Sequence, residues 1–404
     1  MQQDASNPAA RIAEMPDCAE MLQQTQRWSA INSGTDNLAG LAEMAGQLAE
    51  AFSALPGEVT LEEPAPVTAI APDGSEIARE HGRHMVLSVR PQAPLRFLLT
   101  GHMDTVYPAD HPFRELTWID GETLRGPGVA DMKGGIAVIL AALKAFEATA
   151  EAASVGYDVM INSDEETGSL SSAPLIARLA KGKYAALTYE PSALPDGTHA
   201  HARGGSGNYS LTVKGRSAHA GRNPQDGRNA IVAAAELAVR LKALQHEGLS
   251  VNPARIDGGS ANNVVPDHAV LRFNIRPRTQ EAADAFLSDL DRLTREIAER
   301  HEVSIARHGG ISRPPKPVDP RAARLFALVE RCSGELGLHF ATRDTGGVCD
   351  GNNIAACGVP VVDTMGVRGG AIHSPEEYLI VPSLAERAAL SALVLHRLST
   401  GALS

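Results

Sequence analysis

The hydrophobic positions in the first half of the chain alternate between helical spacing and short unbroken runs. Residues 20–55 carry apolar side chains at spacings of three and four, which predicts helical structure. The runs "HMVLSVR" and "LRFLLTG" are nearly continuous in apolar residues, as expected for strands buried on both faces. Further along, "IAVILAALKAF" and "SAPLIARLA" have helical periodicity, whereas "DVMINSD" and "AALTYEPS" have the pattern of strands. Strands that alternate with helices predict a mostly parallel, helix-covered sheet.

The order of elements changes beyond residue 202. Residues 203–311 have the pattern strand, helix, strand, strand, helix, strand, which predicts a small sheet with helices on one face. The proline-rich "ISRPPKPVDP" ends this segment, and a helix, a glycine-rich loop "DTGGVCDGNN", a strand "VPVVDTMG" and a last helix follow. We therefore predict an α/β domain made of residues 1–202 and 312–404, with a ferredoxin-like α+β domain inserted at 203–311.

Composition and charge narrow the class of protein. The chain has 404 residues, 43% hydrophobic and 21% charged, which is ordinary for a globular protein. Its formal charge of −11 argues against nucleic acid or an anionic membrane as partner. No apolar run is long enough to span a bilayer, the start lacks the pattern of a secretory signal, and the four cysteines lack metal-ligand spacing. We expect a cytoplasmic protein with reduced thiols.

Histidines and carboxylates stand just beyond the predicted strands or in loops next to helices. In open parallel sheets the binding crevice lies outside the carboxyl ends of the strands, so these side chains are expected to meet at one edge. Imidazole and carboxylate groups form a ligand set that suits zinc, cobalt or manganese. A metal would also supply positive charge to the acidic run "DEE". The residues concerned are His102, Asp104, Asp131, Glu165, Glu166, Glu190 and His373.

Spacing within these motifs suggests a division of roles. Asp104 lies two residues after His102, so in an extended segment its carboxylate can accept the ring N–H of that histidine and orient it. The neighbours Glu165 and Glu166 point apart, so that one can bind metal while the other faces substrate. Each motif alone has an ordinary explanation, as a surface ion pair, a solvated turn or a glycine-rich loop. Their coincidence at strand ends favours the metal site.

Five motifs in chain order then define a resemblance: "GHMDTV", "GPGVADMKGG", "SDEETGS", "YEPS" and "IHSPEEY". With them the chain resembles the di-zinc metallopeptidase family that includes glutamate carboxypeptidase, acetylornithine deacetylase, succinyl-diaminopimelate desuccinylase and aminoacylase. The resemblance extends from about residue 20 to 398 and is greatest to bacterial glutamate carboxypeptidases. It implies that the inserted domain is a lid and a dimerisation domain.

The resemblance implies a role for each residue of the metal site, and no ligand position departs from the family pattern. Asp131 would bridge two metal ions, with a cis peptide bond between it and Met132. Glu165 would be the general base, and Asp104 would orient His102. The remaining ligands would be His102 and Glu190 at one metal, and Glu166 and His373 at the other.

Further residues of the resemblance lie in or beside the inserted domain. His219, in "GRSAHAG", would reach into the active site of the partner subunit and help to stabilise the oxyanion. Asn263 and Arg276 match residues that hold the substrate carboxylate, and Arg313 matches a further basic substrate-binding residue.

The function that the resemblance implies is zinc-dependent hydrolysis of an amide bond. We expect a homodimeric carboxypeptidase that releases a C-terminal acidic residue, glutamate above all, from a peptide or N-acyl amino acid. Hydrolysis of other N-acyl amino acids, or of dipeptides, remains open because the family shares one metal site. A protein of another class, a non-catalytic binding or scaffold protein, is the third alternative, and the complete ligand set and Glu165 argue against it.

Overall fold

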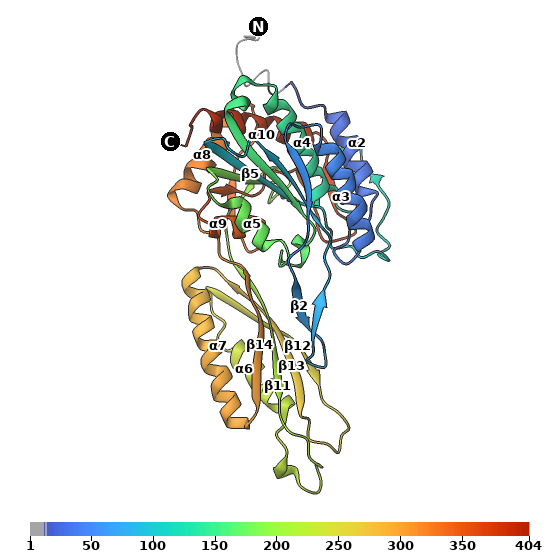
Figure 1. Ribbon diagram of the computed structural model, residues 1–404, viewed down its shortest axis with the longest axis vertical. Helices are drawn as coiled ribbons and strands as arrows, with labels where there is room; N and C mark the ends of the chain where they lie inside the picture. Colours follow the sequence, from blue (N-terminus) through green and yellow to red (C-terminus); the bar gives the residue numbers. More distant parts are fainter. Residues whose placement is uncertain (1–11, 13, 404) are drawn as a thin grey trace.

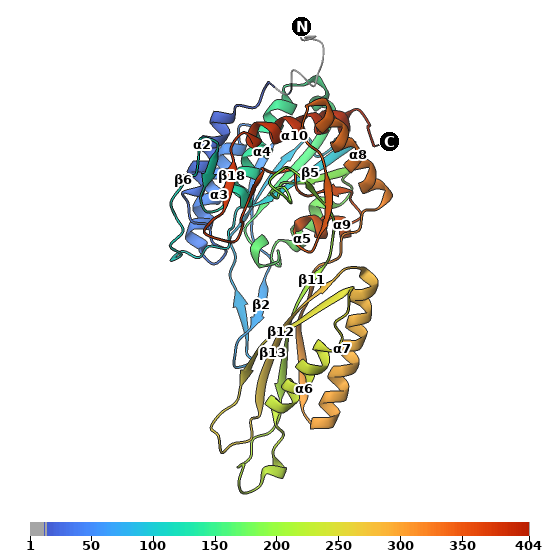
Figure 2. The same ribbon diagram turned by 180° about the vertical axis from the view of Figure 1, so that it is seen from behind.

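The chain forms two domains, of which one is inserted into the other. This computed structural model describes residue 12 and residues 14–403. In Figure 1 the upper domain contains both the blue and the red parts of the chain, and the elongated lower domain contains its yellow middle part. The view from behind shows the same division (Figure 2).

The upper domain is built on a six-stranded sheet in the order β1-β4-β8-β5-β9-β16. β5 runs parallel to both of its neighbours and β16 runs parallel to β9, whereas β1 and β4 are antiparallel to the strands beside them. The α/β fold with a mostly parallel sheet is thus confirmed. The strands are β1 (Glu58–Glu62), β4 (His84–Val89), β5 (Leu95–His102), β8 (Val155–Asn162), β9 (Ala185–Thr188) and β16 (Val361–Val362).

Helices bury both faces of this sheet. Along β5, Phe97 and Leu99 belong to one hydrophobic core and Leu98 to another, because successive side chains of a strand point to opposite faces. Each such buried leucine contributes about 2 kcal/mol of transfer free energy. The first face packs against α2 (Cys18–Ser29), α3 (Leu38–Phe52), α4 (Gly134–Glu147), α8 (Pro320–Glu335) and α10 (Ser383–Ser399), and the second against α5 (Ala173–Ala180) and α9 (Asp350–Ala356).

The N-terminal helical segment is interrupted, where the sequence pattern predicted helical structure throughout residues 20–55. Residues 30–37 leave the helix and brace the chain beyond β5. The Ser33 hydroxyl donates to the carbonyl of Met103 at 2.6 Å, and Thr35 donates to the carboxylate of Asp104 at 2.8 Å. Asn37 then caps α3 by accepting the backbone N–H of Gly40. Long-range hydrogen bonds outweigh helical periodicity here.

A second difference concerns the glycine-rich segment "DTGGVCDGNN". The sequence predicted a loop, but α9 begins at Asp350 within it. The side chain of Asn352 accepts the backbone N–H of Cys349 at 3.1 Å, which satisfies a donor at the helix start. The glycines before Cys349 hid this start, because they lower the helical signal on that side.

The inserted domain has one antiparallel sheet, ordered β12-β13-β11-β14. Helices α6 (Ala230–Lys242) and α7 (Gln280–His301) cover one face of it and share one hydrophobic core with it. The element order β11, α6, β12, β13, α7, β14 agrees with the expected split pattern. The strands are β11 (Ser206–Lys214), β12 (Leu249–Gly258), β13 (His268–Pro277) and β14 (Ser304–Arg313).

In the described part of the chain, three segments connect the domains. Two run side by side at the hinge, where Arg203 and Lys316 exchange backbone hydrogen bonds of 3.0 and 2.9 Å. The third is the hairpin of β2 (Val67–Ile70) and β3 (Glu76–Arg79), which extends down to the inserted domain (Figure 1). Arg272 of that domain donates to the carbonyl of Ile70 at 2.8 Å.

Small sheets complete the upper domain around its loops. A four-stranded sheet consists of β6 (Thr117–Trp118), β7 (Thr123–Arg125), β17 (Gly369–Gly370) and β18 (Tyr378–Ile380). A two-stranded parallel sheet consists of β10 (His199–Arg203) and β15 (Thr342–Thr345).

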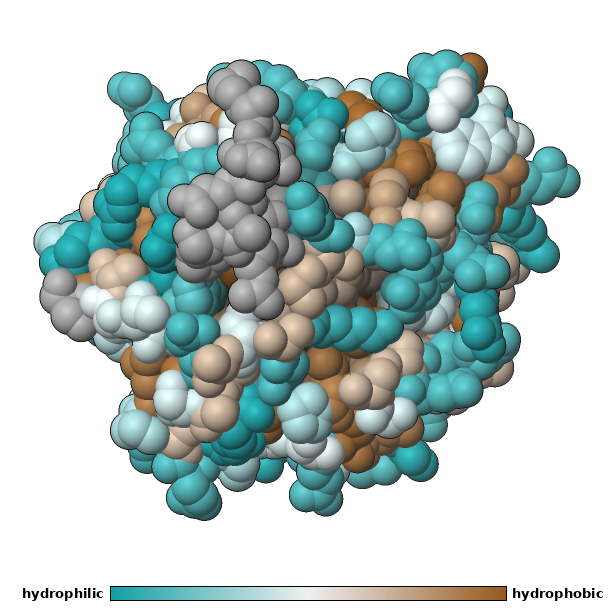
Figure 3. All heavy atoms as spheres, turned by 90° about the horizontal axis from the view of Figure 1, so that it is seen from above, coloured by the Kyte–Doolittle hydropathy of each residue, from teal (hydrophilic) through white to brown (hydrophobic). Residues whose placement is uncertain are grey.

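The end of the upper domain that faces away from the inserted domain carries both hydrophilic and hydrophobic residues. Teal hydrophilic residues are spread across it, with brown hydrophobic residues in patches between them (Figure 3). Among the described residues, no helix combines the length and the apolar character needed to span a membrane.

Candidate metal centre

Neighbouring parallel strands bring the predicted ligands to one edge of the sheet. β5 ends at His102, which lies beside Asn162 at the end of β8. Glu166 follows β8, and Glu190 lies two residues beyond the end of β9. Because these strands are parallel, their carboxyl ends meet, and the side chains that follow them converge.

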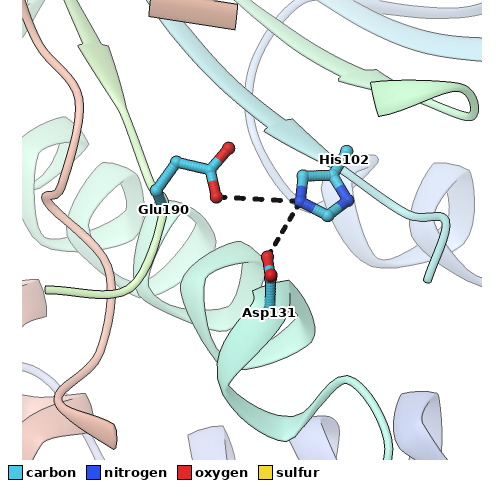
Figure 4. A group of neighbouring side chains, drawn as sticks. All are labelled: His102, Asp131 and Glu190. Atoms are coloured by element: carbon cyan, nitrogen blue, oxygen red, sulfur yellow. Dashed lines mark hydrogen bonds and ion pairs between the residues drawn. The ribbon is translucent and has the colours of Figure 1, made fainter. Parts of the chain in front are cut away.

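The first cluster joins His102, Asp131 and Glu190 (Figure 4). The Nε2 atom of His102 lies 3.1 Å from Oδ1 of Asp131 and 3.8 Å from Oε2 of Glu190. One ligand atom from each residue lies within 4.8 Å of the other two, and all three residues are buried.

The second cluster joins Asp131, Glu166 and His373. The Nε2 atom of His373 lies 3.2 Å from Oδ2 of Asp131 and 3.3 Å from Oε2 of Glu166. The ligand atoms again lie within 4.8 Å of one another. Asp131 therefore turns one carboxylate oxygen to each cluster, and the two clusters share this residue.

The donor set fits a pair of divalent metal ions. Imidazole nitrogen and carboxylate oxygen are the ligands that zinc accepts, and they also suit cobalt and manganese. The Oε1 atom of Glu190 is buried without a hydrogen-bond partner among the residues that the structure describes. Such an atom costs about 1–3 kcal/mol unless something binds it, and a metal ion beside His102 and Asp131 would do so.

The two clusters bring three carboxyl groups close together, and their crowding and burial shift the pKa values of the residues. Burial, followed by the charge of Asp131, raises the pKa of Glu166 to about 7, and burial also raises the pKa of Glu190. Hydrogen bonds to Asp131 and Glu166 raise the pKa of His373 to about 11. For Asp131 burial acts in the opposite direction, but hydrogen bonds from His102 and His373 hold its pKa below the usual range. These carboxylates require positive charge, which protonated histidine or bound metal supplies.

Asp104 makes hydrogen bonds to three residues of the site, His102, Glu165 and Glu166. The Nδ1 atom of His102 lies 3.0 Å from the backbone carbonyl of Asp104 and 3.4 Å from its carboxylate, so the shorter contact is with the carbonyl. The Asp104 carboxylate accepts the backbone N–H groups of Glu165 and Glu166, both at 3.1 Å. It thus connects the end of β5 with the turn that follows β8.

Glu165 lies next to the clusters and pairs with Arg313. The Nη2 atom of Arg313 donates to Oε1 of Glu165 at 2.6 Å, and its Nη1 atom donates to Asp350 at 2.9 Å. Arg313 is 2% exposed, so its guanidinium is engaged by protein carboxylates in this conformation. Burial raises the pKa of Glu165 well above its usual range, and Arg313 opposes that rise.

Glu377 holds the turn that carries Asp131, and the sequence analysis missed it. Its buried carboxylate accepts the backbone N–H groups of Ala130 and Asp131, both at 3.0 Å, and that of Gly128 at 3.2 Å. It also accepts the hydroxyl of Tyr107 at 2.8 Å. The available signal was the second glutamate of "IHSPEEY", four residues after His373. The peptide bond that follows Asp131 is cis, as the resemblance implied.

Two residues of the inserted domain, His219 and Asn263, lie together but away from the clusters. The backbone N–H of Ala220 donates to the carbonyl of Asn263 at 2.9 Å, and His219 forms a β-bridge with Val264. Both His219 and Asn263 are exposed. The segment between β11 and α6, which contains His219, lies at the end of the inserted domain farthest from the upper domain (Figures 1 and 2).

Arg276 lines a second cleft, at the hinge, which shares Arg203 with the cleft of the metal clusters. This cleft has a volume of about 650 Å³, and Arg203, Arg278 and Lys316 also line it. The side chain of Arg276 donates to Asn274 at 3.0 Å and is exposed. Burial and the charge of Arg313 lower the pKa of Arg276.

The clusters open into a cleft of about 410 Å³. Asp131, Glu165, Glu166, Glu190 and His373 all contribute to its lining. Arg203 also lines it, and this arginine is held by a two-pronged ion pair with the buried Asp363, at 2.8 and 3.1 Å. Asp363 follows β16, and the sequence analysis missed both members of the pair.

Comparisons with known proteins agree with this geometry. Carboxypeptidase G2 of Pseudomonas sp. (strain RS-16) is 29% identical over 333 residues, which cover 79% of this chain and 78% of that protein. Succinyl-diaminopimelate desuccinylase of Verminephrobacter eiseniae (strain EF01-2) is 30% identical over 307 residues, which cover 71% and 74%. The structure of the YxeP protein of Bacillus subtilis, described as a dinuclear metal binding peptidase, has a TM-score of 0.65 at 15% identity and covers 94% of this chain and 98% of that one.

The family model named peptidase family M20/M25/M40 matches residues 98–397. This range begins within β5, next to His102, and ends within α10, so it includes every residue of both clusters. Together with the carboxypeptidase G2-like sequence, this establishes a metal-dependent peptidase or amidohydrolase. The chain belongs to peptidase family M20/M25/M40.

Proposed function

We propose that this protein is a carboxypeptidase that hydrolyses the amide bond of a C-terminal acidic residue, glutamate above all. The observation that carries the proposal is the pair of His and carboxylate clusters that share Asp131, with Glu165 beside them in one cleft. The similarity to carboxypeptidase G2 over most of the chain supports it. We propose zinc as the metal, with cobalt and manganese as alternatives.

In the proposed reaction the protein's residues bind, orient and move protons. Two bound metal ions would polarise the scissile carbonyl and lower the pKa of the attacking water. Oε1 of Glu165 is occupied by Arg313, so Oε2 is the atom that takes the water proton and passes it to the leaving amine. Arg313 fixes the orientation of the Glu165 carboxylate, and Asp104 positions the backbone beneath it.

We further propose that the active protein is a homodimer whose inserted domains reach the neighbouring cleft. The segment between β11 and α6, which contains His219 and pairs with the segment of Asn263, lies at the far end of the inserted domain, which favours contact with a second subunit over contact with its own cleft. In the neighbouring cleft His219 would donate to the oxyanion, and Asn263 would bind the substrate carboxylate together with Arg276, which stands at the hinge. The proposed location is the cytoplasm, in keeping with four free thiols.

A substrate panel tests the proposed activity. Metal-reconstituted protein is assayed for amine release from benzoyl dipeptides that end in glutamate, aspartate, alanine, leucine or arginine, with Glu165→Ala as the control. Turnover of the acidic members that disappears in Glu165→Ala supports the carboxypeptidase. Preferred turnover of neutral or basic members would replace it with a deacylase or dipeptidase of the same family. No turnover by protein with bound metal would refute amide hydrolysis.

Mixed dimers test the role of the inserted domain. Homodimers of Glu165→Ala and of His219→Ala are expected to be inactive, but mixing them after partial denaturation creates dimers with one intact site. Recovery of about one quarter of wild-type activity is expected, because half of the dimers are mixed and each has one working site. No recovery would mean that His219 acts within its own chain, and an active His219→Ala homodimer would mean that it has no role in catalysis.

A further inference from the structure

Arg343 stands in the wall of the metal cleft. It lies on β15, paired with Ala200 of β10, and both residues line the cleft. Thr345 lines the cleft as well, as expected for a residue two positions along the same strand. Asp344 between them instead accepts the backbone N–H of Ala202 at 3.1 Å and contacts His201. Strand alternation thus presents Arg343 to the space beside the metal clusters.

The guanidinium of Arg343 differs from the other cations near this cleft because it has no partner. Arg313 pairs with Glu165 and Asp350, and Arg203 pairs with Asp363. The guanidinium of Arg343 makes no hydrogen bond or ion pair with any residue in the described part of the chain. Its five donors therefore face solvent in the cleft wall.

The charge balance of the cleft makes this arginine available to a ligand. The carboxylates of Asp131, Glu166 and Glu190 point to the metal clusters, and Glu165 is paired with Arg313. Arg343 remains as an unpaired positive charge among the residues that line the cleft. A guanidinium binds a carboxylate through two parallel hydrogen bonds, so Arg343 suits a carboxylate of a substrate bound in this cleft.

We propose that Arg343 binds a second carboxylate of the substrate, in addition to its C-terminal carboxylate. This inference rests on the proposed function and assigns a binding residue to the second acidic group of its substrate. The second carboxylate could belong to the acyl half of the substrate or to the side chain of the released amino acid. Both sources present the same chemistry to Arg343, and the experiment below distinguishes them.

The test uses four substrates that differ in charge but not in shape. The acyl group is succinyl or its amide, succinamoyl, and the released residue is glutamate or glutamine. The variants are Arg343→Gln and Arg343→Lys, with Arg324→Gln as a charge-matched control, because Arg324 is an exposed arginine of α8 outside the cleft. Dissociation constants are also measured in the Glu165→Ala background, which binds without turnover.

Arg343→Gln is expected to lower kcat/KM, and to weaken binding, roughly 10- to 100-fold for substrates that carry the recognised carboxylate. Their uncharged counterparts should change by no more than about twofold, and Arg343→Lys should restore part of the loss. A loss confined to succinyl compounds assigns the acyl half, and a loss confined to glutamate compounds assigns the side chain. Arg324→Gln should match wild type throughout.

Equal losses on all four substrates, or no loss on any, would overturn the role of Arg343 while leaving the carboxypeptidase intact. If wild-type protein hydrolysed none of them, the proposed function would fall. The binding measurements would then decide the Arg343 proposal separately, since charge-dependent weakening by Arg343→Gln supports it and its absence overturns it.

Discussion

Replacing Glu377 with glutamine should loosen the turn that presents Asp131 to both metal clusters. The Glu377 carboxylate accepts four hydrogen bonds, three from backbone N–H groups of residues 128–131 and one from Tyr107. Glutamine keeps the size of the side chain, but one of its terminal atoms is a donor. Glu377→Gln therefore changes hydrogen bonding with little change in packing.

The expected loss in the free energy of unfolding depends on which carboxylate oxygen of Glu377 the amide nitrogen replaces. Oε1 of Glu377 accepts the N–H groups of Ala130 and Asp131, and Oε2 accepts Gly128 and Tyr107. With the amide nitrogen of glutamine in the Oε2 position, the N–H of Gly128 and the hydroxyl of Tyr107 would each face another donor instead of an acceptor. The Tyr107 hydroxyl also contacts the carbonyl of Ser374 at 2.8 Å and keeps that acceptor, so one charge-assisted bond is lost outright and another in part. We expect a loss of about 3 kcal/mol in the free energy of unfolding.

Metal affinity should fall as well, because Glu377 acts on the metal through the backbone of Asp131. Groups that orient a metal ligand in this way change affinity by about 10- to 100-fold when they are mutated. Urea unfolding of the metal-free protein measures the stability, and competition with a chelator measures the metal dissociation constant. Tyr107→Phe is the matched control, since it removes one donor from Glu377 and should cost about 1 kcal/mol.

The reasoning would be refuted if Glu377→Gln kept wild-type metal affinity and lost less than about 0.5 kcal/mol of stability. If Glu377→Gln and Tyr107→Phe lowered stability and metal affinity equally, the contact with Tyr107 would account for the whole effect. The hydrogen bonds between Glu377 and the turn at residues 128–131 would then contribute nothing.

Two further predictions concern buried charge in the same domain. Asp363→Asn leaves Arg203 and Lys316 buried without their carboxylate and should lower the free energy of unfolding by about 3–5 kcal/mol, measured by urea denaturation; a loss below about 1 kcal/mol would contradict this. Burial, then the charge of Arg387, lowers the pKa of His199 to about 3, and Nη1 of Arg387 donates to its Nε2 atom at 3.0 Å. The unfolded chain binds this proton near pH 6.5, so stability is lost as pH falls from about 6.5 toward 3, by about 2 kcal/mol at pH 5. Unfolding at pH 7.5 and 5.0 should show a steeper loss for wild type than for His199→Gln, and identical losses would refute it.

The sequence predicted the metal clusters well because each ligand stands next to a strong local pattern. His102 ends one short apolar strand and Glu190 follows another, and parallel strands bring such positions to one edge regardless of loop details. Asp131 stands one turn before an apolar helix, α4, so its position also follows from periodicity. His373 lacks such a neighbour and was found through its motif.

The residues that were missed depend on contacts between distant segments. Glu377 contacts the turn at residues 128–131 although it lies 246 positions after Asp131 in the sequence. Arg203 and Asp363 lie 160 residues apart, and neither has a local pattern that names the other. The contacts of Arg313 with Glu165 and Asp350 are also long-range and have no local signal, and its binding of substrate stays a prediction. Local spacing carries no information about such pairings.

Metal stoichiometry tests the central claim most directly, namely that two metal sites share Asp131. Wild-type protein and single variants are dialysed against zinc, and bound metal per chain is measured by plasma mass spectrometry. We predict two ions for wild type, none for Asp131→Ala, and one each for Glu190→Ala and Glu166→Ala, because each of these removes a ligand from one cluster. One ion or none in wild type, or one ion retained by Asp131→Ala, would contradict the shared site.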